Sequence, residues 1–461
     1  MQPGPDAGCE PVSRPRPLSG FPEWSPSERI IEQHVLDVLR EVFELHGFAS
    51  VETRAVEPLD QLLHAGEIDK EVYLLRRLQA DDADPEPDRA KQLGLHYDLT
   101  VPFARYVLEN AGKLAFPFRR YQIQKAWRGE RPQEGRYREF TQADIDVIGA
   151  DTLAFHHDAE MALVMADVFA RLPLPPLRMQ VNNRKLIEGF YRGLGVEDVP
   201  GVLRAVDKLD KVGAAGVHEV LTSEVGLSAT QAESCLQLAQ ISGTDGVAER
   251  VRALGVTHEQ LDRGLDELVA VLDAVAGAGR PGFEIVADLR IARGLDYYTG
   301  TVYETQMQGF EQVGSVCSGG RYDALASDGR TTYPGVGISF GVTRTLGPLF
   351  SRDALHASRS TPTCVLVALP DEASRPLAAG VASSLRGRGV PTEVAPEASK
   401  YGKQIKFAER RGIPFVWFPR AESGGHEVRD IRSGDQVPAD PTTWLPAADD
   451  LRPAVSGEPA R

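Results

Sequence analysis

The sequence predicts an α+β protein whose main domain is an antiparallel sheet with a helical insertion, followed by a small α/β domain. Two strand-like segments, 120–127 and 140–148, flank a polar loop, as in an antiparallel hairpin with a long loop. Leucine- and alanine-rich helical patterns fill residues 191–279, and strand-like segments resume after them. From residue 364 onward, apolar strands alternate with helices, which is typical of a small, mostly parallel α/β domain.

Composition and charge narrow the possible functions. With 461 residues, 42% of them hydrophobic and 25% charged, the chain resembles a soluble protein of two or three domains. No apolar run approaches the roughly 20 residues that cross a membrane, and no apolar signal core is present. A net charge of -15 argues against indiscriminate nucleic-acid binding but permits a local basic patch. The cysteines are far apart, which favours a reducing cytoplasm and offers no metal-binding spacing: Cys9, Cys235, Cys317 and Cys364.

The first helix is expected to begin after a disordered, proline-bearing leader at residues 1–21. Ser25 to Glu28 form a capping box with proline at the first helical position. The helix ends at Gly47, and a short strand is expected at residues 50–53. Its buried stripe has helical spacing: Ile30, Ile31, His34, Val35, Val38, Leu39, Val42 and Phe43.

A second helix is expected at residues 102–110, after an acidic, proline-bearing loop at 81–88. Thr100 has the position of a helix cap, and Asp98 that of a carboxylate that favours the helix dipole. Capping does not exclude contact with a ligand.

The predicted hairpin is rich in arginine although the protein as a whole is acidic. Loop arginines are explained by a solvated hairpin tip, but Arg128 lies at a strand end beside Trp127. A guanidinium at such a place is suited to bidentate binding of a phosphate. The six arginines are Arg119, Arg120, Arg128, Arg131, Arg136 and Arg138.

Helical patterns follow at residues 151–171 and through 191–279, the second of which we interpret as an insertion. Capping boxes are predicted at Ser228 and Thr257, and the last helix at 261–275. Nothing in the insertion suggests catalysis.

The stretch from Ile291 to Glu304 follows a strand at 283–290 whose alternation indicates one buried face. A hairpin with an exposed arginine explains it. The alternative is the lip of a pocket, in which Arg293 binds an anion and tyrosine rings flank a flat ligand.

A glycine-rich strand at 335–344 carries glycine or serine at every second position, which leaves one face without side chains. Such a face allows a flat ring, or alternatively a packed helix, to lie against backbone. Arg344 at the predicted strand end favours a nucleotide.

A polar linker is expected at 352–361, and the α/β domain after it has helices at 375–387 and 399–411 and strands at 364–369, 392–395 and 414–418. The second helix carries a basic cluster opposed by Glu409: Lys400, Lys403, Lys406, Arg410 and Arg411. A charged helix face is usually only solvated, but this patch is the densest outside the hairpin.

Three blocks of the chain resemble the motifs of class II aminoacyl-tRNA synthetases. They are the helix ending at Gly47 with Pro58, the hairpin with Arg128, Glu130, Arg136 and Phe140, and the glycine-rich strand with Arg344. The stretches Arg293 to Tyr298 and Gly319 to Tyr322 look like the two histidine-site signatures of histidyl-tRNA synthetases. Gly402 to Lys406 resembles the anticodon-binding domain of that family. One departure is Thr343, where the third motif usually has an acidic residue.

The resemblance, over roughly residues 25–435, implies a histidine–tRNA ligase of class II fold. It implies a catalytic domain at 22–350 with its insertion at 191–279, and an anticodon-binding domain at 361–461. It also implies ATP and Mg²⁺, tRNA(His) as partner, a homodimer and a cytoplasmic location. The alternative is a non-catalytic paralogue, either a regulatory subunit of histidine biosynthesis or a sensor of histidine or RNA.

Residue roles follow from the same resemblance. The catalytic residues would be Arg128, Arg293 and Arg344. ATP would contact Arg128, Glu130 and Arg344. Histidine would contact Asp98, Thr100, Gln142, Asp146, Arg293, Tyr297, Tyr298 and Tyr322. tRNA would contact Arg136, Lys403 and Lys406.

Overall fold

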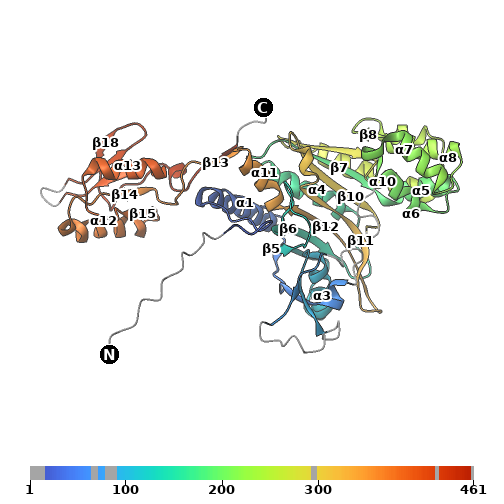
Figure 1. The fold of residues 1–461 in the computed structure, drawn as a ribbon, viewed down its shortest axis with the longest axis horizontal. Helices are drawn as coiled ribbons and strands as arrows, with labels where there is room; N and C mark the ends of the chain where they lie inside the picture. Colours follow the sequence, from blue (N-terminus) through green and yellow to red (C-terminus); the bar gives the residue numbers. More distant parts are fainter. Residues whose placement is uncertain (1–15, 64–70, 78–90, 292–297, 421–424, 458–461) are drawn as a thin grey trace, which may run out of the picture.

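The computed structural model describes residues 16–63, 71–77, 91–291, 298–420 and 425–457. In this part of the chain, nine strands form one large sheet in the order β1-β5-β6-β12-β11-β10-β7-β9-β8 (Figure 1). The strands are β1 (Ala49–Ser50), β5 (Phe118–Trp127), β6 (Glu139–Ile148), β12 (Thr332–Gly341), β11 (Cys317–Ser327), β10 (Thr301–Met307), β7 (Leu177–Asn183), β9 (Phe283–Asp288) and β8 (Ser242–Gly243). The run from β5 to β7 is antiparallel, whereas β1 and β9 pair in parallel with their neighbours, so the predicted antiparallel-sheet class is confirmed.

Two helices, α1 (Pro26–Leu45) and α4 (His156–Phe169), contribute to the core beside this sheet. The predicted capping box is present at the beginning of α1, where the Ser25 hydroxyl and the Glu28 carboxylate each accept an amide proton from the other residue. The predicted stripe is buried at Val35, Leu39 and Phe43, among others, while Ile30, His34 and Val38 are only partly buried.

Several predicted boundaries are wrong because long-range contacts decide them. The strand expected at 50–53 is β1 and ends at Ser50. The helix expected from 151 begins at His156, since Asp151 has a φ of +61°. The strands on either side of Ile291–Glu304 do not form a hairpin, because β7 lies between β9 and β10.

The N-terminal residues 16–21 contact the arginine hairpin. The carbonyl of Gly20 accepts the amides of Arg138 at 2.7 Å and Glu139 at 3.1 Å. The expected loop at 81–88 and most of the expected leader lie outside the described residues.

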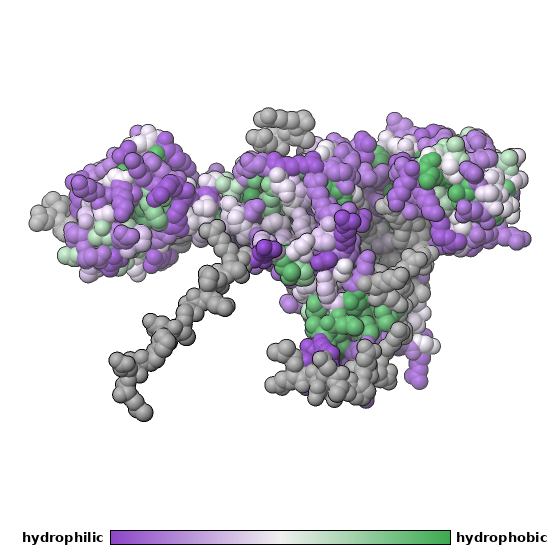
Figure 2. All heavy atoms as spheres, in the orientation of Figure 1, coloured by the Kyte–Doolittle hydropathy of each residue, from purple (hydrophilic) through white to green (hydrophobic). Residues whose placement is uncertain are grey.

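A smaller lobe carries α3 (Thr100–Asn110) and a three-stranded sheet in the order β2-β4-β3. Its elements are β2 (Val56–Pro58), α2 (Leu59–Leu63), β3 (Leu74–Leu75) and β4 (Leu93–Leu95). Figure 2 shows hydrophobic surface over this lobe, where Leu74, Leu75 and Leu93 are exposed.

Helices α5 to α10 pack at the far end of the sheet from β1 and β5 (Figure 1). They are α5 (Arg184–Gly193), α6 (Val199–Val206), α7 (Leu209–Ser223), α8 (Ala229–Ala239), α9 (Val247–Arg252) and α10 (Glu259–Ala276). Helices α5 and α10 touch backbone to backbone, because a Cβ added at Gly189 or Gly264 would lie 2.2 Å from an amide nitrogen of the other helix. The capping box at Ser228 is confirmed, but the cap of α10 is His258, one residue after the predicted Thr257.

The C-terminal sheet has the order β15-β14-β16-β17-β18 and a core of its own. Its strands β14 (Val365–Val367), β15 (Thr392–Val394) and β16 (Phe415–Phe418) are parallel and alternate with α12 (Arg375–Gly387) and α13 (Tyr401–Arg411). Sequence analysis missed the antiparallel hairpin of β17 (Glu427–Asp430) and β18 (Gln436–Pro438), so this sheet is mixed rather than mostly parallel.

The predicted linker at 352–361 contains a strand, β13 (Leu355–Ala357), which pairs with β19 (Val455–Gly457) near the end of the chain. The chain therefore passes from the large sheet to the C-terminal part through β13, and it returns beside the same strand through β19. No helix in the described ranges has the length and apolar character needed to cross a membrane.

Candidate functional site

The register of the central strands arranges polar side chains in rows on one face of the large sheet. Directly paired residues share a face, so Gln122, Asp144, Ser339, Ser318 and Glu304 form one row across five strands. The opposite face carries apolar residues that pack on the helices. Since a polar row on a central sheet is costly without partners, this face is the candidate site.

The neighbouring row is Arg120, Asp146, Gly337 and Gly320. Arg120 is fully buried and its Nη2 lies 2.6 Å from Asp146 Oδ2. Asp146 Oδ1 accepts the hydroxyl of Tyr322 at 2.8 Å. Burial raises the pKa of Asp146 to about 6, opposed by Arg120 and the Tyr322 hydroxyl, which favour the carboxylate.

Glycines are required in this row because other side chains occupy the space. A Cβ added at Gly337 would lie 2.0 Å from Asp146 Oδ1, and one at Gly335 would lie 2.5 Å from the Tyr322 ring. A Cβ at Gly320 would lie 2.8 Å from the Tyr298 ring. The expectation of a bare sheet face is therefore wrong at Gly335 and Gly337, whereas Ser339 and Gly341 line a cleft.

Asp98 and Thr100 lie at the beginning of α3, and Asp98 interacts electrostatically with Arg120, Asp146 and Tyr298. We call this group of side chains, together with Tyr322, the polar pocket. Asp98 Oδ1 accepts the Val101 amide at 3.1 Å. Thr100 is the first residue of the helix and the N-cap is Leu99, so the prediction of Thr100 as the cap is wrong, and it is the Asp98 carboxylate that satisfies an amide of the first turn. Burial raises the pKa of Asp98, although Arg128 and the Val101 amide favour its ionised form.

A cleft of about 590 Å³ lies at the open end of the glycine-rich strand. Its walls carry three guanidiniums, those of Arg128, Arg136 and Arg344, and Glu130 is its single carboxylate among the described lining residues. Arg136 lies 3.7 Å from Glu130, and Arg128 donates to the carbonyl of Tyr97 at 3.0 Å. The excess of positive charge makes this cleft suited to an anion.

Arg344 does not end the strand as predicted, since β12 stops at Gly341 and Arg344 lies in the first turn of α11 (Val342–Ser351). Its guanidinium donates to the carbonyl of Val313 at 2.8 Å. Burial and the nearby guanidiniums of Arg136 and Arg128 lower its pKa. An anion in the cleft would relieve that repulsion.

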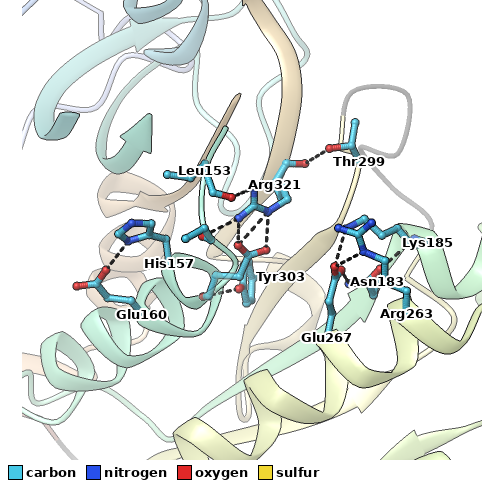
Figure 3. Close-up of polar contacts among 12 residues, drawn as sticks. Leu153, His157, Glu160, Asn183, Lys185, Arg263, Glu267, Thr299, Tyr303 and Arg321 are labelled. Atoms are coloured by element: carbon cyan, nitrogen blue, oxygen red, sulfur yellow. Dashed lines mark hydrogen bonds and ion pairs between the residues drawn. The ribbon is translucent and has the colours of Figure 1, made fainter. Parts of the chain in front are cut away.

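The Gly319 to Tyr322 block is divided between the two faces of the sheet. Tyr322 faces the pocket, whereas Arg321 points to α4 and forms a buried, bidentate pair with Asp158 (Figure 3). Arg321 also donates to the carbonyls of Leu153 and Ala154, each at 3.2 Å. Arg321 therefore supports the fold beneath the site.

Other predicted site residues lie elsewhere. Arg293 and Tyr297 fall outside the described residues. Lys403 and Lys406 are exposed on α13, away from the cleft. Thr343 is buried, and its hydroxyl accepts the Thr141 amide at 2.8 Å, which ties α11 to β6.

Sequence analysis missed Arg120, Asp144 and Glu304, which share the polar rows. Asp144 is two residues from Asp146 on β6, so strand alternation alone could have placed it on the same face. Arg120 was noted only as one of six hairpin arginines.

The chain resembles known proteins both in sequence and in fold. The family profile described as histidyl-tRNA synthetase matches residues 20–345. The histidine–tRNA ligase of Micrococcus luteus is 59% identical over 456 residues, covering 96% of this chain and 99% of the relative. That of Cutibacterium acnes is 58% identical over 455 residues, covering 97% and 100%. The crystal structure of histidyl-tRNA synthetase from Nostoc sp. matches with a TM-score of 0.82 and 33% identity, over 95% of this chain and 98% of that one.

Proposed function

The chain belongs to the histidyl-tRNA synthetase family, and we propose that its polar pocket binds histidine while its arginine cleft binds ATP. The chain is an aminoacyl-tRNA synthetase with histidine–tRNA ligase function, and ATP is its substrate. One observation supports this division of the site into a histidine part and an ATP part. The two polar rows and the arginine cleft lie on the same face of the sheet, and Ser339 belongs to a row and also lines the cleft.

The arginine cleft is suited to the triphosphate. Arg128 would bind the α-phosphate, with Glu130 near the adenine, and Arg344 would bind the γ-phosphate and stack on the adenine. The mutual repulsion of these guanidiniums supports the assignment, because it is relieved when an anion enters. A preformed set of donors costs no reorganisation when charge develops on the phosphates.

The pocket is suited to the histidine side chain and its ammonium group. Asp146 is an acceptor for an imidazole N–H, and Tyr322 and Tyr298 would contact the ring. Asp98 and Thr100 would hold the ammonium group, and Gln142 would lie along the histidine pocket with Asp146. All of these side chains surround the same part of the sheet, and Asp98, Asp144 and Asp146 interact electrostatically.

The chemistry needs positioning and charge neutralisation rather than a protein nucleophile. The histidine carboxylate would attack the α-phosphate in line, displacing pyrophosphate and forming histidyl-adenylate. Arg293 would stabilise charge at the α-phosphate in this step, and Tyr297 would contribute to the histidine site. The tRNA would then take the histidyl group from the adenylate.

Mg²⁺ would enter with ATP as part of the substrate. Among the described residues, no group of three or more His, Cys, Asp or Glu side chains could hold a metal. Mg²⁺ is commonly held by one or two carboxylates together with phosphates, so this chain fits a metal carried by ATP. The carboxylates that act on Arg344 are Glu130 and Glu304.

The remaining assignments concern larger parts of the chain. We propose a catalytic domain at 22–350 and an anticodon-binding domain at 361–461, with the insertion now bounded by α5 and α10 instead of the expected 191–279. tRNA(His) would contact Arg136 at the cleft and Lys403 and Lys406 on α13. A homodimer and a cytoplasmic location complete the proposal.

A non-catalytic paralogue, as regulatory subunit or sensor, is the alternative, and the full-length ligase relatives do not favour it. The structure described as an ATP phosphoribosyltransferase regulatory subunit/histidyl-tRNA synthetase from Bacillus halodurans is only 20% identical, and its TM-score of 0.68 shows a shared fold alone.

Histidine-dependent ATP–pyrophosphate exchange tests the proposal. The wild-type protein should catalyse exchange and aminoacylate tRNA(His). Arg293→Ala should lower exchange by about 10²-fold or more, because a transition-state charge contact is lost. Near-normal exchange by Arg293→Ala would remove the role assigned to that residue, and no exchange by the wild type would favour the paralogue.

A further inference from the structure

Two polar atoms on β6, one of them in a residue that lines the arginine cleft, lack a hydrogen-bond partner among the described residues. Gln142 Oε1 and Asp144 Oδ1 are both buried, and neither has a partner among the described residues. Asp144 as a whole is 2% exposed. Buried acceptors of this kind are rare in folded proteins and commonly indicate a ligand.

Both residues are connected through Ser339. Gln142 Nε2 lies 2.7 Å from Ser339 Oγ. Ser339 is also the direct partner of Asp144 across the sheet, so both side chains lie on one face, and the Ser339 hydroxyl favours the ionised form of Asp144. The three side chains come from only two strands, β6 and β12, so their spacing is set by the sheet. We call these three neighbouring side chains the Gln142–Ser339–Asp144 relay.

The protonation state of Asp144 determines the direction of the relay. A carboxylate can only accept, so the single hydroxyl proton of Ser339 must then go to Asp144. Ser339 Oγ consequently accepts from the Gln142 N–H, and the Gln142 carbonyl oxygen remains to accept from a ligand. A protonated Asp144 can instead donate to Ser339, which then donates to the Gln142 carbonyl. In that state the Gln142 amide N–H faces the ligand.

We propose that Asp144 and Ser339 are positioning residues that act through Gln142. When Asp144 is ionised, they turn the Gln142 carbonyl oxygen toward the substrate ammonium group. When Asp144 is protonated, they turn the Gln142 amide N–H toward it instead. The proposal rests on the proposed function, in which Gln142 contacts histidine. It gives Asp144 and Ser339 a part in histidine binding, although neither is among the histidine-contacting residues expected from the sequence.

The electrostatic surroundings make Asp144 able to titrate near neutral pH. Burial raises the pKa of Asp144 to about 7, while Arg120 and the Ser339 hydroxyl favour its ionised form, and Asp146 and Asp98 oppose it. Among the described residues, the titratable and charged groups that act on or respond to Asp144 are Arg120, Asp146, Asp98, Tyr298 and Cys317. Histidine should therefore bind more weakly as the pH falls through this range.

Matched substitutions of Ser339 test the relay. Ser339→Ala removes the hydroxyl, whereas Ser339→Thr keeps it, and both are compared with the full-length wild type in the exchange assay. KM for histidine and KM for ATP are measured from about pH 6 to about pH 9. The ratio of the variant KM to the wild-type KM cancels the titration of the substrate imidazole and of Asp146, which all forms share.

In alkaline buffer, Ser339→Ala should raise KM for histidine about tenfold and KM for ATP less than about twofold. Its histidine KM ratio should fall toward one at about pH 6, because the wild-type relay is then reversed. Ser339→Thr should restore a ratio near one at every pH. An asparagine at position 144 cannot titrate. The KM of Asp144→Asn for histidine, divided by the KM of Ser339→Ala for histidine, should therefore stay constant with pH.

Three results would overturn the relay while leaving the proposed function intact. They are a histidine KM ratio for Ser339→Ala that is flat with pH, equal increases in both KM values, and a Ser339→Thr variant that behaves as Ser339→Ala does. Absence of histidine-dependent exchange in the wild type would instead contradict the proposed function.

Discussion

The buried Arg321–Asp158 pair allows a sharp test of which signature residues serve chemistry and which serve the fold. Arg321 is 6% exposed and Asp158 is fully buried, with Nε of Arg321 3.0 Å from Asp158 Oδ2. Arg321→Met removes the cation and also the donors to the carbonyls of Leu153 and Ala154. Leaving one member of such a pair uncompensated costs about 3–5 kcal/mol of folding free energy.

The pH dependence of this loss has a definite sign. Burial raises the pKa of Asp158 even with Arg321 present, and removing the cation raises it further. The stability associated with a protonated Asp158 is fully present below its unfolded pKa and is lost as the pH rises through its folded pKa. The deficit of Arg321→Met relative to wild type should therefore be largest in alkaline buffer and should shrink as the pH falls.

Thermal unfolding and histidine-dependent exchange provide the measurements. The catalytic part should unfold about 5–10 °C lower in Arg321→Met at alkaline pH, while exchange per folded molecule below that transition stays within about twofold. Arg321→Met/Asp158→Leu is the matched control and should recover most of the loss, since a buried pair can be replaced by apolar residues at little cost. Equal destabilisation of the single and double variants would refute this reasoning. So would a large loss of exchange without a change in stability.

Two further predictions concern the site and the basic helix. Tyr322→Phe removes the hydroxyl that donates to Asp146, so KM for histidine should rise about tenfold. The acid limb of the exchange pH profile should also move upward from the Asp146 pKa of about 6, because the carboxylate loses a stabilising donor. An unmoved acid limb would show that Asp146 does not control it. Lys403→Glu/Lys406→Glu should raise KM for tRNA several-fold, most strongly at low salt, without changing the exchange activity. The same charge reversal at Arg375 on α12 is the control and should have little effect. Equal effects of the two changes on aminoacylation would contradict a specific basic face on α13.

Predictions that rest on local physics agree with the structure. The capping boxes at Ser25 and Ser228 involve hydrogen bonds within four residues, and both are present. The hairpin of β5 and β6 has the predicted pairing, since the two strands are neighbours in sequence. Where two neighbouring side chains could both accept the capping amide, as at Thr257 and His258, the predicted cap was wrong by one residue.

Predictions that depended on distant parts of the chain were less accurate. The stretch before Glu304 is not a hairpin, because β7, more than a hundred residues earlier, pairs with both flanking strands. Arg344 lies on a helix because the pairing of β12 ends at Gly341, opposite Gln142 of β6, and residues 352–361 contain a strand because β19 returns to pair with β13. Pairing partners of this kind leave no signal within a short window of sequence.

The sequence by itself determined which residue types serve this protein: the arginines of the hairpin, the carboxylates of β6, the paired glycines and the tyrosines that follow them. It also determined the local helices and strands, because caps and periodicity act within a few residues. Only the tertiary structure decided that Tyr322 faces the pocket while Arg321 is buried against α4, and that Asp144, Ser339 and Gln142 lie beside one another on one sheet face. The physical reason is that a strand fixes only the alternation of its side chains, whereas the packing of the whole sheet decides which face becomes a site and which becomes core.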